Sequence, residues 1–109
     1  MKNEIILFVK AKLAFQNKDI KTALHICSKL IQRNPYLVEV YNYMGSILGT
    51  IKRYDHAEIF FRKAIELDPK WMSPYNNLAS LYFNRGDIQA AILIYKQVIE
   101  LKPNYAVAY

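Results

Sequence analysis

Apolar residues recur along this chain at the spacing of amphipathic helices, in blocks that alternate with short polar turns. In the middle of the chain the pattern predicts one helix over about 39–51 and a partner helix over about 55–67. A later helix is predicted to end near Gly86, because glycine suits the left-handed residue that stops a helix, and Asp87 can cap the next helix. Asp19 holds the same capping position earlier in the chain. The pattern therefore predicts an all-α protein built from helix pairs.

The order of residue types repeats every 34 positions. Prolines, alanines and tyrosines keep this interval, at Pro35, Pro69 and Pro103, at Ala23, Ala57 and Ala91, and at Tyr41, Tyr75 and Tyr109. A period of this length indicates stacked copies of one supersecondary unit, none of which buries its apolar face alone. Aligned on the prolines, the repeats cover 4–37, 38–71 and 72–105, and 106–109 begin a fourth. We therefore expect a single domain over residues 1–109.

When each repeat is numbered by places 1 to 34, its columns resemble the tetratricopeptide repeat. The family's small residue at place 8, its alanine at place 20 and its aromatic at place 24 correspond here to Ala11, Gly45 and Ala79, to Ala23, Ala57 and Ala91, and to Cys27, Phe61 and Tyr95. Small residues at places 8 and 20 allow two helices to approach closely. The resemblance implies an α-solenoid of antiparallel helix pairs, a right-handed superhelix of three repeats plus the start of a fourth.

The first repeat departs most from this pattern. Lys10 stands at place 7, where the other copies have Met44 and Leu78. A terminal repeat has one side in water and tolerates such a change. We therefore expect the first repeat to be the N-terminal cap of the array.

The net charge of +6 comes almost wholly from the first repeat. Residues 1–37 hold seven Lys and Arg against two acids, whereas 38–71 hold five against five and 72–109 three against two. Such a patch attracts acidic peptide, nucleic acid or anionic lipid, although solvation of an exposed end is the simpler explanation. The single Cys27 forms no internal disulfide, and no apolar stretch approaches the roughly 20 residues that span a bilayer. We expect a cytoplasmic protein that does not enter membranes.

No catalytic motif occurs in the chain. A phosphate-binding glycine loop, a Gly-x-Ser-x-Gly elbow and a His-Glu-x-x-His pair are all missing. His25 and His56 fall in different repeats, too far apart to share a metal readily. Cys27 stands where the other copies have aromatic residues, so we interpret it as a small core side chain. We expect no enzyme activity, metal or cofactor in these residues.

The resemblance implies that the first helices of successive repeats line a concave groove. The candidate peptide-binding residues are Phe8, Lys12, Phe15, Asn42, Ser46, Thr50, Asn76, Ser80, Phe83 and Asn84. Asparagine amides can pair with the backbone of an extended peptide, and aromatic rings can supply pockets for its side chains. A simpler interpretation of Phe8 and Phe15 is that they only pack within the N-terminal helices. We expect a non-catalytic protein-interaction module that holds a peptide or partner helix.

Two alternatives stay open. The segment Tyr75-Asn76-Asn77-Leu78-Ala79 resembles repeats of the O-linked N-acetylglucosamine transferase array, so the chain could be the recruiting arm of a larger enzyme such as a glycosyltransferase. RNA binding is the less favoured alternative, because Lys12 and Glu39 are the only charges expected in the groove. The family's carboxylate clamp for acidic chaperone tails is not expected here, because its four places hold Phe8, Lys12, Ser73 and Asn77.

The C-terminal end of the repeat pattern is open. The last complete helix carries Ile92, Tyr95 and Ile99 on the side where a further repeat would pack. Either the chain is a piece of a longer protein, or a second copy covers this side. We expect self-association through the exposed end, because large apolar patches seldom remain bare.

Overall fold

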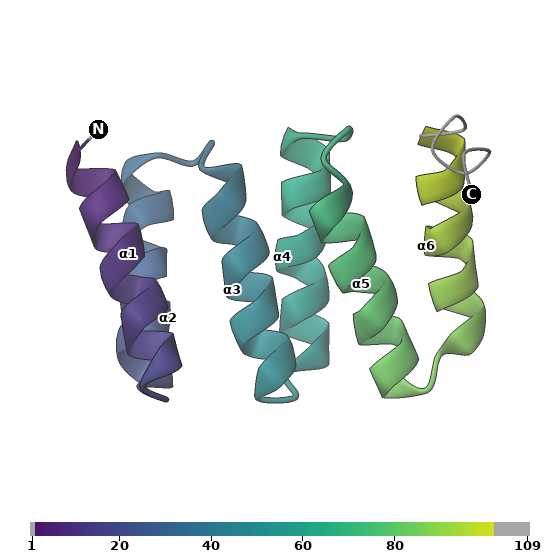
Figure 1. Ribbon diagram of the computed structural model, residues 1–109, viewed down its shortest axis with the longest axis horizontal. Coiled ribbons are helices and arrows are strands. Elements are labelled where there is room, and N and C mark those ends of the chain that lie inside the picture. Colours follow the sequence, from purple (N-terminus) through teal and green to yellow (C-terminus); the bar gives the residue numbers. More distant parts are fainter. Residues whose placement is uncertain (1, 102–109) are drawn as a thin grey trace.

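The computed structural model describes residues 2–101, and within that range it contains six α-helices. Their bounds are α1 Lys2–Gln16, α2 Ile20–Arg33, α3 Val38–Thr50, α4 Tyr54–Leu67, α5 Met72–Arg85 and α6 Ile88–Leu101. The three helix pairs follow one another along the long axis of the molecule, with α1 at one end and α6 at the other, and each helix is antiparallel to the next (Figure 1). The predicted all-α solenoid of helix pairs is confirmed. The predicted start of a fourth repeat at 106–109 lies outside the described residues, as do Pro103 and Tyr109.

The turn inside each helix pair has the same backbone geometry in all three repeats. The residue at place 15 is left-handed each time, with φ of 63°, 65° and 87° at Lys18, Lys52 and Gly86. The backbone N–H of the residue that follows donates a hydrogen bond of 2.8 Å to a carbonyl in the last turn of the preceding helix. These bonds run from Asp19 to Ala14, from Arg53 to Leu48 and from Asp87 to Tyr82. Such a bond satisfies a carbonyl that the helix end would otherwise leave unpaired. The predicted stop at Gly86 is confirmed, and two lysines adopt the same conformation.

Side-chain caps and prolines set the other helix boundaries. The Asp19 carboxylate accepts a hydrogen bond from the Thr22 N–H at 3.2 Å, and Asp87 accepts one from the Ala90 N–H at 3.3 Å. Both predicted caps are therefore confirmed. After α2 and α4 the prolines at 35 and 69 follow the last capping residue directly, where a residue without an N–H cannot extend the helix.

The core lies between the helices in two clusters. One gathers residues of α1, α2 and α3 around Cys27, Leu30 and Ile47, and the other gathers residues of α4, α5 and α6 around Phe61 and Leu78. The place-20 alanines, at 23, 57 and 91, are all buried, as close helix approach requires. Each cluster joins the second helix of one repeat to the next repeat, so each repeat depends on its neighbour for burial.

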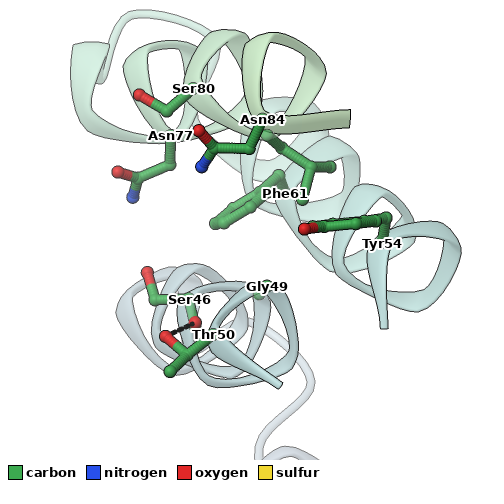
Figure 2. A pocket seen from close by; sticks show the side chains of 10 residues that line it. Ser46, Gly49, Thr50, Tyr54, Phe61, Asn77, Ser80 and Asn84 are labelled. Atoms are coloured by element: carbon green, nitrogen blue, oxygen red, sulfur yellow. Dashed lines mark hydrogen bonds between the residues drawn. The ribbon is translucent and has the colours of Figure 1, made fainter. Parts of the chain in front are cut away.

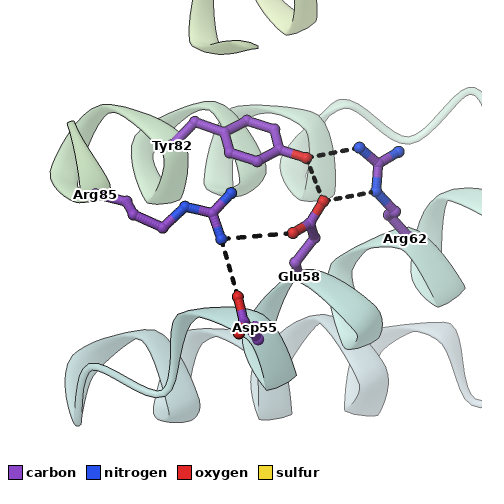
Figure 3. A network of polar contacts seen from close by, with 5 residues as sticks. All are labelled: Asp55, Glu58, Arg62, Tyr82 and Arg85. Carbon is purple, nitrogen blue, oxygen red and sulfur yellow. Dashed lines mark hydrogen bonds and ion pairs between the residues drawn. The ribbon is translucent and has the colours of Figure 1, made fainter. Parts of the chain in front are cut away.

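A charged network fastens α5 to α4 (Figure 3). The Tyr82 hydroxyl donates to Glu58, and Arg62 donates to Glu58 at 3.1 Å and to the Tyr82 hydroxyl at 2.6 Å. Arg85 lies 3.6 Å from Glu58 and 3.2 Å from Asp55. Burial by itself would raise the pKa of Glu58, but the hydrogen bonds from Tyr82 and Arg62, with the positive charges of Arg62 and Arg85, outweigh it and lower that pKa. The network therefore stabilises the ionised form of Glu58.

We predict that Gly45→Ala destabilises the fold. A Cβ at this position would lie 2.5 Å from the Phe61 ring, which is buried and has little room to move. Overpacking costs about 1–3 kcal/mol, and it outweighs the gain of up to about 1 kcal/mol in helix propensity. Gly49→Ala is the matched control, since its Cβ would meet only Leu81 at 3.6 Å and should stabilise the helix. Urea unfolding of both variants measures the difference, and equal stability would contradict the prediction.

We predict that stability falls below about pH 4.5 more steeply in the wild type than in Glu58→Gln. The pKa of Glu58 is lower in the folded state, so its contribution is present above the unfolded pKa and is lost as the pH falls through the folded pKa. Thermal unfolding between about pH 6 and pH 3 checks this. Glu66→Gln, an exposed carboxylate on the same helix, is the control and should track the wild type.

Candidate functional site

The first helices of the three repeats, α1, α3 and α5, border two adjoining pockets, which together we call the groove. The pocket between α3 and α5 has a volume of about 210 Å³, and the pocket between α1 and α3 has about 180 Å³. Ser46 on α3 lines both of them. The groove therefore runs across all three repeats, because helices at the same place in successive repeats lie beside one another.

Hydroxyl and amide side chains border the pocket between α3 and α5 (Figure 2). Ser46 and Thr50 on α3 face Asn77, Ser80 and Asn84 on α5 across it, and aromatic rings of α4 at 54 and 61 close its far side. The Thr50 hydroxyl donates to the Ser46 carbonyl at 2.9 Å, so its oxygen lone pairs are available as acceptors. This wall offers donors and acceptors but no charge.

The pocket between α1 and α3 is aromatic. The ring of Tyr43 meets the rings of Phe8 and Phe15 edge to face, with centroids 5.5 Å and 5.8 Å apart. The Lys12 ammonium lies 4.3 Å from the Phe8 centroid, within the range of a cation–π contact. Trp71 and Glu39 complete the lining. The pocket thus combines three aromatic rings with one cation and one carboxylate.

Asn42 joins the second repeat to the third from within the groove floor. Its side-chain N–H donates to the Ser73 hydroxyl at 3.2 Å, and its carbonyl accepts from the Asn77 amide at 3.0 Å. Asn42 is only 8% exposed. Its amide therefore holds α5 against α3 and orients Asn77, while Asn77 itself borders the open pocket.

The structure brings most of the candidate binding residues together. The groove lining includes Phe8, Lys12, Asn42, Ser46, Thr50, Ser80 and Asn84. Three candidates lie elsewhere: Phe15 packs against Tyr43, and Asn76 and Phe83 are exposed on α5 beside neither pocket.

Tyr43, Asn77 and Trp71 also line the groove, although the candidate set did not include them. Tyr43 and Asn77 share place 6, where the first repeat has Val9, so no common residue type marked this column. Trp71 comes from the loop before α5 and not from a first helix. The Asn-Asn pair at 76–77 was the available signal, since both residues belong to the segment that resembles the transferase repeats.

Cys27 is buried in the core, as its interpretation as a small core side chain predicts. Burial raises the pKa of the Cys27 thiol to about 11, so it is protonated at neutral pH and packs as a core side chain with Ala23 and Leu30.

Within residues 2–101, no group of three or more His, Cys, Asp or Glu side chains is placed to hold a metal ion. Among α1 to α6, none has both the length and the apolar character needed to cross a membrane.

The row of antiparallel helix pairs and its groove define an α-helical repeat protein. Residues 38–70 and residues 74–105 each match a family model described as tetratricopeptide repeat. The chain belongs to the tetratricopeptide repeat family, and its repeats form a protein-interaction module.

Known proteins with similar repeats differ widely from one another. Over 80 residues the chain is 28% identical to Superkiller complex protein 3 of Mus musculus, covering 73% of this chain and 5% of that protein. Over 81 residues it is 27% identical to the probable UDP-N-acetylglucosamine–peptide N-acetylglucosaminyltransferase SEC of Arabidopsis thaliana, covering 74% and 8%. The crystal structure of MamA protein superposes with a TM-score of 0.87 and 17% identity, over 94% of this chain and 56% of that one. The chain thus spans a small part of the two curated relatives.

We predict that Asn42→Ala lowers the free energy of unfolding by about 1–2 kcal/mol, because it removes two hydrogen bonds of a buried amide and leaves the partly buried Ser73 and Asn77 without these partners. Chemical denaturation measures the loss. Asn84→Ala makes the same change at an exposed position and should stay within about 0.5 kcal/mol of the wild type. Equal effects of the two substitutions would show that the Asn42 bonds do not hold the repeats together.

Proposed function

We propose that the groove binds an extended segment of a partner protein. The observation that carries this proposal is the continuity of the two pockets across α1, α3 and α5, with an aromatic part and an amide part in line. An extended peptide needs pockets for alternate side chains and polar groups for its backbone. The groove supplies both kinds of group along one continuous surface.

The chemistry of each pocket favours a particular part of the ligand. The rings of Phe8, Tyr43 and Trp71 suit an apolar or aromatic anchor side chain, which gains binding energy by leaving water. The amides of Asn77 and Asn84 suit the backbone of the residues that follow, since an amide donates and accepts at once. The exposed Asn76 and Phe83 would contact a ligand that continues over α5.

The groove charges favour a ligand segment with little net charge. Lys12 and Glu39 line the same pocket and oppose each other in sign, so neither an acidic nor a basic segment gains much. The four places of the carboxylate clamp hold Phe8, Lys12, Ser73 and Asn77, which include a single cation. We therefore propose that the ligand is a partner segment with little net charge and not an acidic chaperone tail or RNA. A cytoplasmic setting suits the unpaired, reduced Cys27.

A second candidate is that these repeats recruit partners for a larger enzyme. The chain spans 8% of the plant transferase to which it is similar. Asn77, which belongs to the segment that resembles the transferase repeats, borders the groove. The groove would then select the substrate protein while a separate domain performs the chemistry. Sequence adjoining residues 1–109 in the same gene decides between an independent module and such an arm.

Selection from a displayed library of random peptides tests the groove. We expect the selected peptides, titrated against the 109-residue chain, to bind Asn84→Ala about three- to tenfold more weakly, in line with the loss of one hydrogen bond. Trp71→Leu should weaken binding about tenfold or more, because it removes an aromatic anchor surface. Asn76→Ala and Phe83→Ala report whether the ligand continues over α5.

Gln32→Ala is the control, since it removes an exposed amide from α2, away from the groove. Selected peptides that bind Asn84→Ala and Trp71→Leu as tightly as the wild type would place the binding surface elsewhere. A library that yields no binder would also count against the proposal. Binding to single-stranded RNA that falls steeply with salt would instead support the RNA alternative.

A further inference from the structure

The contact between one repeat and the next uses the same places each time. From the second helix of a repeat come residues at places 17, 21, 24 and 28, which in α2 are Ile20, Leu24, Cys27 and Ile31. From the first helix of the following repeat come places 3, 6 and 10, which in α3 are Val40, Tyr43 and Ile47. The α4–α5 contact uses these places in part, through Tyr54, Phe61 and Ile65 on one side and Leu81 on the other. Place 21 holds Glu58 and place 6 holds Asn77 in this contact, so two of its places are polar. The chain therefore contains two examples of one docking interface.

The outer side of α6 presents the first half of that interface without a partner among residues 2–101. Ile92, Tyr95 and Ile99 are 42%, 45% and 53% exposed, and Ile88 is exposed beside them. The residues that share place 24 with Tyr95 are enclosed, since Phe61 in α4 is 2% exposed and Cys27 in α2 is fully buried. Because these side chains are apolar at all four places, the α6 side is equipped to receive a first helix.

The outer side of α1 presents the second half. Ile6, Val9 and Leu13 occupy places 3, 6 and 10, and they are 51%, 49% and 52% exposed. At the same places Val40 and Ile47 of α3 are 3% and 0% exposed. The first repeat was expected to be a cap that faces water. Lys10 is indeed exposed, but the outer side of α1 is an apolar stripe and not the polar face that a cap needs.

We propose that copies of this chain stack head to tail, with the α1 side of one copy docked on the α6 side of the next. The two sides lie at opposite ends of the row of helices (Figure 1), so the contact is heterologous and its repetition builds an open chain of copies. The occupant is a second copy because its α1 stripe has apolar residues at the three places that α3 already uses against α2 inside the molecule. This inference is independent of the proposed groove function, since the α1 and α6 residues of the contact line neither pocket of the groove.

Charge determines how the stacking responds to salt. Each copy carries a net charge of +6, so copies repel one another at low ionic strength. Salt screens this repulsion and does not weaken apolar burial. Stacking therefore strengthens as salt increases, whereas association through an ion pair would weaken.

Sedimentation velocity of the 109-residue chain tests the proposal with one variant for each end. Ile92→Glu places a carboxylate in the α6 side, and Val9→Glu places one in the α1 side, so each should weaken self-association by roughly a hundredfold. Alone, each variant stays at the monomer mass of 12.8 kDa. Mixed in equal amounts they form a pair of about twice that mass, because one variant keeps an intact α1 side and the other an intact α6 side. The wild type forms larger species that grow with concentration.

Leu93→Glu is the matched control on α6. Leu93 is exposed at place 22, where the counterparts His25 and Ile59 are exposed inside the array, so this change should leave stacking intact. Ile99→Glu and Leu13→Glu form a second pair of variants if either of the first pair loses its helical circular dichroism. A symmetric α6–α6 dimer would persist in Val9→Glu and would give no mixed pair, which would overturn the proposal. A wild type that remains monomeric at high concentration and high salt would also overturn it.

Discussion

Each helix pair of this protein buries its apolar face only against the pair beside it, and the rest of the structure depends on this constraint. The place-20 alanines and Gly45 bring helices close enough for Phe61 and Cys27 to be enclosed. Because the same places make every contact, successive first helices lie side by side and border one continuous groove. The same constraint makes the outer sides of α1 and α6 apolar, since each is built like an inner side.

Polar residues near the groove divide between holding the repeats and presenting chemistry. The side-chain amide of Asn42 is hydrogen-bonded to Ser73 and Asn77, so a residue type suited to peptide recognition here connects two repeats. Asn77, bonded on one side, borders the pocket with a fixed orientation, which lowers the entropy that a ligand contact would cost. On another side of α5, the network of Glu58, Tyr82 and Arg62 fixes the same helix to α4. The third repeat is thus positioned from two directions.

Local signals in the sequence predicted the fold well where they were strong. Asp19, Asp87 and Gly86 act at their own helix ends, so their residue types were enough to place the turns. Lys18 and Lys52 adopt the same left-handed conformation, yet lysine carries no signal for it, because the packing of the two helices imposes the turn. For the groove, register found most of the lining residues on first helices, but it missed Tyr43 and Asn77 at place 6, where the three repeats share no residue type. Trp71 was missed because a loop carries it.

The 34-residue period alone determined the family, the helix pairs and the places that pack, because each copy of the period must satisfy the same burial. Tertiary structure decided what the remaining polar and apolar residues do. Asn42 and Asn84 are the same residue type on neighbouring first helices, but one is enclosed between repeats and the other faces the open pocket. Ile92 and Leu24 share a place, but among residues 2–101 only Leu24 has a following helix against it. Such differences depend on which neighbours surround a side chain, so the residue type alone does not predict them.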